Sequence, residues 1–195
     1  MSLIEKFKKA DAGATVKNFD NSNEPKIKII DNQFYKIIET EKSSIGKSGI
    51  VFLEPMAMEY SKRMGVPAPT VVGVDRDDAL ALFATEKVHG QEGLDFIEQN
   101  PELKEQVELK IEELKNRYLD IGIKRQFDLK DMMIEYKDGD LIITPLDFER
   151  VKYTPALNLT KIVEICNDWK IEVPKRVQDK LNVIEEYSNT IEERF

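Results

Sequence analysis

Pairs of apolar runs that flank a short polar turn occur three times in this chain of 195 residues. The first pair turns at residues 31–32, the second at residues 75–78 and the third at residues 137–140. Short apolar runs joined by Asp, Asn or Gly are typical of β-hairpins. Because a two-stranded hairpin is barely stable alone, each of the three must pack against other elements. Antiparallel strands therefore form the framework of the predicted fold.

Helical patterns separate and follow these hairpins. Pro55 suits the first turn of a helix, and Gly65 would end that helix. Across residues 103–121, apolar side chains recur at intervals of three and four, which predicts a long helix with one buried face. Asn100 would cap this helix and Gly122 would end it.

The two ends of the chain differ in pattern. The lysine-rich residues 6–17 are expected to be a charged tail. Two helices are expected near the C-terminus, one over residues 159–169 and one that begins at Pro174. The order of strands, helix, strands and then mostly helices indicates an α+β fold. We predict a small β-rich N-terminal lobe with one helix over residues 1–86 and a helical C-terminal lobe over residues 87–195.

Charge and composition exclude several classes of function. The chain has 37 acidic and 29 basic residues, a net charge of −8, which argues against DNA or membrane binding through bulk charge. No apolar run approaches the about 20 residues of a membrane-spanning helix. One cysteine, Cys166, and one histidine, His89, exclude an internal disulfide and a Cys/His zinc site, and a cytoplasmic location is expected. Any chemistry is therefore expected from carboxylates, lysines and backbone groups.

Two aspartates flank the third hairpin. Asp128 precedes its first strand and Asp147 follows its second strand, so a folded hairpin would bring both carboxylates to the same end. Neighbouring carboxylates repel each other unless a cation or a proton lies between them, so the pair indicates Mg²⁺ binding or general-base chemistry. The alternative is that both are solvated loop acids.

A lysine lies in the middle of the second predicted strand. Alternation places Phe34, Lys36 and Ile38 on one face, so a cation interrupts an apolar set. A cation in that position needs a carboxylate or an anionic ligand, and Glu54 or Glu59 of the following helix would supply the carboxylate. The alternative is an edge-strand lysine that points to water.

Taken in order, these positions resemble the protein-kinase-like fold. The resemblance is greatest to short archaeal-type atypical kinases: the small kinase subunit of the KEOPS tRNA-modification complex, the RIO kinases and aminoglycoside-phosphotransferase relatives. In residues 54–90, a helix glutamate, the Gly-Val-Pro-Ala-Pro turn at 65–69 and two strands are similar to the regulatory helix and the hinge of that fold. Asp128 and the Asp-Phe-Glu segment at 147–149 are similar to its catalytic loop and its metal-binding segment.

The resemblance implies ATP and Mg²⁺ as cofactors and a role for each matching residue. Lys36 would hold the α- and β-phosphates and pair with Glu54, or with Glu59 because Glu54 lies at the helix start. Asp128 would accept the proton of the attacking hydroxyl. Asp147 would hold Mg²⁺ against the β- and γ-phosphates.

Further positions follow from the same resemblance. Backbone groups of Glu86 and Val88 would hydrogen-bond adenine, and Gly13, within Ala12–Val16, would belong to a reduced phosphate loop. The implied function is that of an atypical serine/threonine protein kinase. Its partners would be a protein substrate and, by analogy with the family, a tRNA-modification complex.

Two departures from the family pattern keep other functions open. The sequence reads Arg-Gln-Phe-Asp at residues 125–128, so the histidine that precedes the catalytic aspartate is missing. Met133 stands where an asparagine would bind a second metal, and a thioether is a poor ligand for Mg²⁺, although Asp131 is near. The alternatives are a catalytically inactive binding or scaffold module and a small-molecule kinase. The place of the histidine would fall to one of three cations: Lys124, Arg125 or Lys130.

Overall fold

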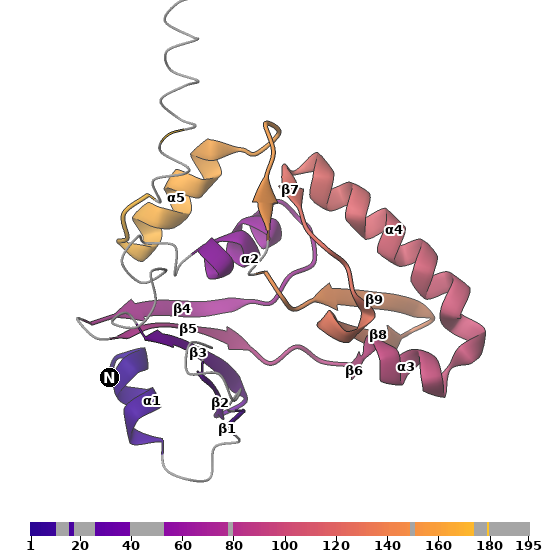
Figure 1. Cartoon of the computed structure of the whole chain (residues 1–195), viewed down its shortest axis with the longest axis horizontal. Coiled ribbons are helices and arrows are strands. Elements are labelled where there is room, and N and C mark those ends of the chain that lie inside the picture. Colours follow the sequence, from indigo (N-terminus) through magenta and orange to yellow (C-terminus); the bar gives the residue numbers. More distant parts are fainter. Residues whose placement is uncertain are drawn as a thin grey trace, which may run out of the picture.

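A five-stranded antiparallel sheet forms the first lobe of the computed structural model, which describes residues 1–10, 16–17, 26–39, 53–77, 80–148, 151–173 and 179 (Figure 1). In spatial order its strands are β1 (Val16–Lys17), β2 (Lys26–Ile30), β3 (Gln33–Glu39), β5 (Leu80–Glu86) and β4 (Val71–Arg76). The first two predicted hairpins are therefore present as β2–β3 and β4–β5. Asp31 and Asn32 both have positive φ, at 48° and 62°, as a two-residue hairpin turn requires.

The N-terminal lysines belong to a helix, so the expected charged tail is wrong for residues 6–9. Helix α1 (Leu3–Lys9) begins with a capping box, in which the Ser2 hydroxyl accepts from the Glu5 N–H and the Glu5 carboxylate accepts from the Ser2 N–H. Its buried residues Ile4 and Phe7 pack on one face of the sheet, against Tyr35 of β3 and Leu82 and Ala84 of β5.

The opposite face of the sheet carries helix α2 (Leu53–Arg63), which ends before Gly65 as predicted. Phe83 alternates with Leu82 along β5 and joins the core that includes α2. Helix α5 (Leu159–Trp169) packs on α2 from the far side (Figure 1), with Cys166 Sγ 3.8 Å from Met56 Sδ.

The second lobe combines helices with two small sheets. Its elements are β6 (Gln91–Glu92), α3 (Gly93–Gln99), α4 (Lys104–Asp120), β7 (Ile123–Lys124), β8 (Met132–Lys137), β9 (Asp140–Pro145) and β10 (Lys152–Tyr153). One sheet has the strand order β6-β8-β9, and the other consists of β7 and β10. The third hairpin, β8–β9, and the long helix are present as predicted. Helix α3 was not predicted, and Asn100 ends α3 instead of capping α4 with its side chain. A single 3₁₀ turn over Pro101–Leu103 leads into α4.

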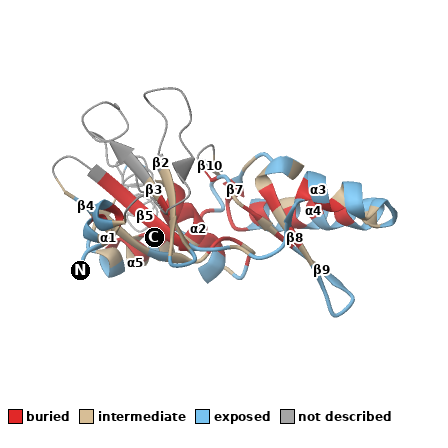
Figure 2. Ribbon diagram, turned by 90° about the horizontal axis from the view of Figure 1, so that it is seen from below, coloured by how far each residue is buried: buried red, intermediate tan, exposed pale blue. Residues whose placement is uncertain are grey.

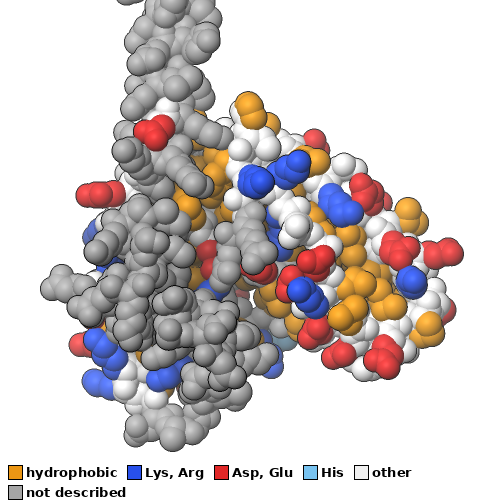
Figure 3. Space-filling view, in the orientation of Figure 1, with side chains coloured by type: hydrophobic (Ala, Val, Ile, Leu, Met, Phe, Trp, Pro, Cys, Tyr) orange, Lys and Arg blue, Asp and Glu red, His pale blue; other side chains and the backbone are white. Residues whose placement is uncertain are grey.

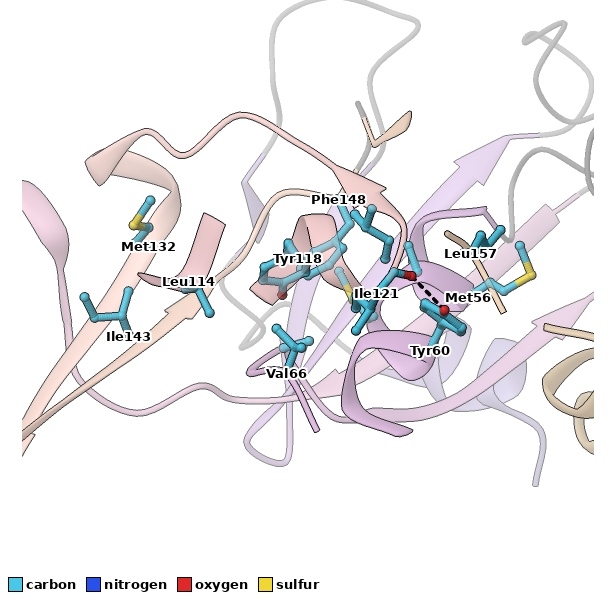
Figure 4. Packing of buried hydrophobic residues seen from close by; sticks show 14 of the residues in the cluster. Met56, Tyr60, Val66, Leu114, Tyr118, Ile121, Met132, Ile143, Phe148 and Leu157 are labelled. Carbon is cyan, nitrogen blue, oxygen red and sulfur yellow. Dashed lines mark hydrogen bonds between the residues drawn. The ribbon is translucent and has the colours of Figure 1, made fainter. Parts of the chain in front are cut away.

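One buried cluster joins the two lobes (Figures 2 and 4). It includes Tyr60 of α2, whose hydroxyl donates to the Ile121 carbonyl at 2.7 Å and accepts from the Asn158 N–H at 2.9 Å. The predicted boundary between residues 86 and 87 falls at the end of β5 and stays a prediction. The helix expected from Pro174 lies outside the described residues. Among the described helices, none combines the length and the apolar character that crossing a membrane requires.

Candidate functional site

Lys36 and Glu54 form a buried ion pair in the first lobe. The Lys36 Nζ lies 2.8 Å from Glu54 Oε2, and the two side chains are 14% and 9% exposed. The alternative prediction, that Glu59 pairs with Lys36, is wrong, because the Glu59 carboxylate pairs with Arg63 of the same helix at 2.8 Å. The alternative that Lys36 lies on an edge strand and points to water is also wrong, because its strand, β3, lies between β2 and β5.

The sheet register and the helix start explain why the pair forms. Lys36 lies opposite Ile27 of β2 and Phe83 of β5, so its backbone is fixed on both sides. Its neighbour Tyr35 faces α1, and alternation sends Lys36 to the face that carries α2. Glu54 lies in the first turn of α2, where the helix dipole favours a carboxylate. Local structure thus brings one cation and one anion together inside the lobe.

A second group of charged residues gathers where the third hairpin ends. A pocket of about 170 Å³ is lined by Arg125, Gln126, Asp128, Lys130, Asp131 and Asp147. Met132 pairs with Pro145 at the end of the hairpin, and the Leu146 N–H donates to the Asp131 carbonyl at 2.8 Å. This closure brings Asp128 and Asp147, both exposed, to one pocket, as the hairpin pattern predicts.

A third aspartate, Asp131, lines the pocket, and Met133, which stands at the sequence position of the family's asparagine, does not. Met133 lies within β8, opposite Thr144, whereas Asp131 ends the 3₁₀ turn that follows Asp128 and lines the pocket. Carboxylate oxygens are the ligands that Mg²⁺ prefers, and Mg²⁺ commonly takes only one or two of them beside phosphates and waters. Within the described ranges, no three acidic, His or Cys side chains could hold a metal ion by themselves. The residues fit an Mg²⁺ ion that is partly held by a nucleotide.

The three cations considered for the place of the missing histidine lie in different surroundings. Lys124 is exposed on β7, and Lys130 is exposed where it lines the pocket. Arg125 is half-buried, and its guanidinium lies over the Phe148 ring. Burial lowers the pKa of Arg125, whereas the charges of Asp147 and Asp131 act in the opposite direction.

The predicted adenine-binding segment follows β5. The Glu86 N–H donates to the Thr70 carbonyl at 2.9 Å, so that N–H is used within the sheet. The resemblance therefore leaves the Glu86 carbonyl and the backbone of Val88 as groups for adenine. Gly13 and Glu149 lie outside the described residues. On the face shown in Figure 3, acidic and basic side chains are interspersed over the second lobe.

Comparisons with solved structures identify the class of fold. No protein-family model matches the chain, and no curated protein matches its sequence. A structure of the bifunctional kinase-methyltransferase WbdD matches with a TM-score of 0.51 at 12% identity, over 73% of this chain and 33% of WbdD. Rad53 in complex with AMP-PNP gives a TM-score of 0.48 at 16% identity, over 75% of this chain and 42% of Rad53.

These likenesses concern architecture, and the chain spans only about a third of the length of WbdD. The chain has an α+β, two-lobed protein-kinase-like fold. The narrower resemblance to short archaeal-type kinases stays a prediction.

Proposed function

We propose that this chain is an ATP- and Mg²⁺-dependent phosphotransferase, an atypical serine/threonine protein kinase. The observation that carries the proposal is the buried ion pair between Lys36 and Glu54. A buried pair contributes little to stability, because desolvation of both charges offsets their attraction. A lysine oriented by one carboxylate on a sheet next to the hinge suits a different purpose, the binding of nucleotide phosphates.

The aspartate pocket would supply the remaining chemistry. The hydroxyl oxygen of the acceptor would bond to the γ-phosphorus of ATP, while the bond from that phosphorus to the β–γ bridging oxygen breaks. Asp128 would accept the proton that the hydroxyl loses. Asp147 would hold Mg²⁺, which neutralises phosphate charge when bound. Lys130 lines the same pocket and would face the transferred phosphoryl group. The protein contributes positioning and charge rather than covalent chemistry.

Asp131 would take the part that an asparagine has in related kinases. It lines the pocket beside Asp128, and an oxygen ligand suits Mg²⁺ better than the thioether of Met133. The missing asparagine then need not mean a missing ligand, which favours an enzyme over an inactive scaffold.

A protein acceptor is supported by access to the pocket. Asp128 and Asp147 are exposed, so a hydroxyl on the surface of another macromolecule can approach them. The preference for serine and threonine, the cytoplasmic location and the link to a tRNA-modification complex rest on composition and resemblance, and they stay predictions.

Thermal shift measurements on the full chain test this function. ATP should raise the melting temperature, and Mg²⁺ should enlarge that rise, because only the folded chain binds the complex. Asp147→Asn should keep the melting temperature of the free protein and abolish the Mg²⁺-dependent increment. Asp138→Asn is the matched control, an exposed acid in the turn at the far end of the same hairpin. Absence of any ATP effect on the parent chain would support the scaffold instead.

A further inference from the structure

We propose that Arg125 is a positioning residue for Asp147 and that it acts through the ring of Phe148. The inference rests on the proposed function, because it assigns a role in holding Mg²⁺ with the nucleotide. It concerns a half-buried cation that no step of the proposed chemistry uses.

Arg125 lies among three aromatic rings, here called the aromatic cage: Tyr118, Phe127 and Phe148. Its Cζ is 4.3 Å from the ring centroid of Phe148, 5.1 Å from that of Phe127 and 5.7 Å from that of Tyr118. The rings also contact one another, with centroids 5.5 Å apart for Tyr118 and Phe127 and 6.1 Å apart for Tyr118 and Phe148. Figure 4 shows Tyr118 and Phe148 side by side in the core. The guanidinium is thus held by one ring two residues away, one ring from the preceding helix α4 and one ring that follows β9.

The surroundings of Arg125 are not those of a residue selected for stability. Its Nη1 is buried and makes no hydrogen bond within the described part of the chain, and its Nε donates to the neighbouring Gln126 carbonyl at 3.2 Å. A buried polar nitrogen without a partner is unfavourable. Cation–π attraction to the three rings offsets this cost, so the guanidinium adds little net stability. A guanidinium kept in such a place is better explained by what it does for the adjoining pocket.

The connection to the pocket is short. Phe148 directly follows Asp147 and is fully buried, so the position of its ring sets the backbone from which the Asp147 carboxylate extends. Arg125 lies over that ring and also lines the pocket, where its charge attracts the carboxylates of Asp147 and Asp131. It therefore acts on the direction of Asp147 in two ways, by packing and by charge. Lys124 and Lys130 are exposed, and neither has a ring contact of this kind among the described residues.

The test measures the Mg²⁺ requirement of ATP binding in full-length variants. Arg125→Met keeps a flexible side chain of similar length among the rings but removes the charge and the planar stack. We expect the Mg²⁺ concentration that gives half of the ATP-dependent thermal shift to rise about tenfold, as for other residues that orient a metal ligand. ATP binding without Mg²⁺ and the melting temperature of the free protein should change little. Arg125→Lys should give a smaller rise in the Mg²⁺ requirement.

Two further variants separate positioning from a merely structural role. Arg117→Met removes another guanidinium of the same region, which donates to the Gly65 carbonyl, and should lower the melting temperature without changing the Mg²⁺ requirement. Phe148→Leu should raise the Mg²⁺ requirement, and its combination with Arg125→Met should raise it no further, because both changes act on one path.

Each outcome decides a different claim. An unchanged Mg²⁺ requirement in Arg125→Met, with normal Mg²⁺ dependence in the parent chain, overturns the positioning role and leaves the proposed function in place. An equal loss of ATP binding with and without Mg²⁺ also overturns it, because that result describes general damage. A parent chain that does not respond to ATP overturns the proposed function and this inference together. If Arg125→Met fails to fold, Arg125→Lys provides the same comparison.

Discussion

The two charged regions of the molecule are built in opposite ways. Lys36 and Glu54 are nearly buried and paired at 2.8 Å, with their backbones fixed by a central strand and a packed helix. Asp128 and Asp147 are exposed and share an open pocket with a third acid. The first region is complete within the chain, because each charge has its counterpart. In the second, three carboxylates line an open pocket together with Arg125 and Lys130, so the region has room for a ligand and its cation.

This difference predicts how mutations divide between stability and activity. Removal of one charge of the buried pair should destabilise the fold, because the other charge then stays in the protein interior without this counter-charge. A change in the open pocket should affect chemistry and leave folding almost unaltered.

The largest effect is expected at Asp128. Asp128→Asn keeps the shape of the side chain but removes the proton acceptor, so phosphoryl transfer from ATP should fall by about 10²- to 10⁴-fold. The melting temperature should stay the same or rise, because one of three neighbouring negative charges is gone. Radiolabelled phosphate release and transfer, compared with the Asp138→Asn control, measure the effect. A rate equal to that of the parent chain contradicts the role of Asp128.

The next effect is expected in the buried pair. Glu54→Gln leaves the Lys36 ammonium without its carboxylate and should lower the free energy of unfolding by about 3–5 kcal/mol. Glu59→Gln is a matched control on the same helix, because its pair with Arg63 is more exposed and should contribute only about 0–1 kcal/mol. Urea denaturation of both variants gives the comparison.

A double variant sharpens the same comparison. Lys36→Met combined with Glu54→Leu should recover most of the stability that Glu54→Gln loses, because no charge stays buried. It should not recover ATP binding. Stability that does not return would mean that the ion pair itself, rather than the absence of an unpaired charge, holds this lobe together.

The framework around these regions was predictable because its signals are local. The turn at Asp31 and Asn32 and the proline and glycine that bound α2 are properties of a few adjacent residues. The alternation of side chains along the strand also identified Lys36 as an unusual cation, and the following helix offered two candidate partners, Glu54 and Glu59. Choosing Glu54 required the packing of α2 on the sheet, which no local pattern contains. The capping box of Ser2 and Glu5 was a readable signal for α1 that the lysines obscured.

The parts that were missed or left open depend on loop geometry and on distant contacts. Asp131 was noted only as a nearby acid; it lines the pocket at the end of a 3₁₀ turn that follows Asp128, a detail that residue counting from Asp128 does not give. The aromatic cage draws its rings from α4, from the segment before Asp128 and from the segment that follows β9. Such a cluster forms only when the lobe folds. From the sequence alone, Arg125 was therefore only one of three cations considered for the place of the missing histidine.

The smallest effect is a pH-dependent change in stability, and it is expected at Tyr118 of the aromatic cage. Burial raises the pKa of Tyr118 to about 12 from the usual value of 10, partly opposed by the charge of Arg125. Below pH 10 the hydroxyl is protonated in both states, so its contribution to stability is complete. Between pH 10 and 12 the unfolded chain loses this proton first, and stability should fall by up to about 3 kcal/mol. Tyr118→Phe has no such proton, so its urea midpoint should decline less between pH 9.5 and 11.5 than that of the parent chain. Equal declines would show that this tyrosine is not the group that titrates.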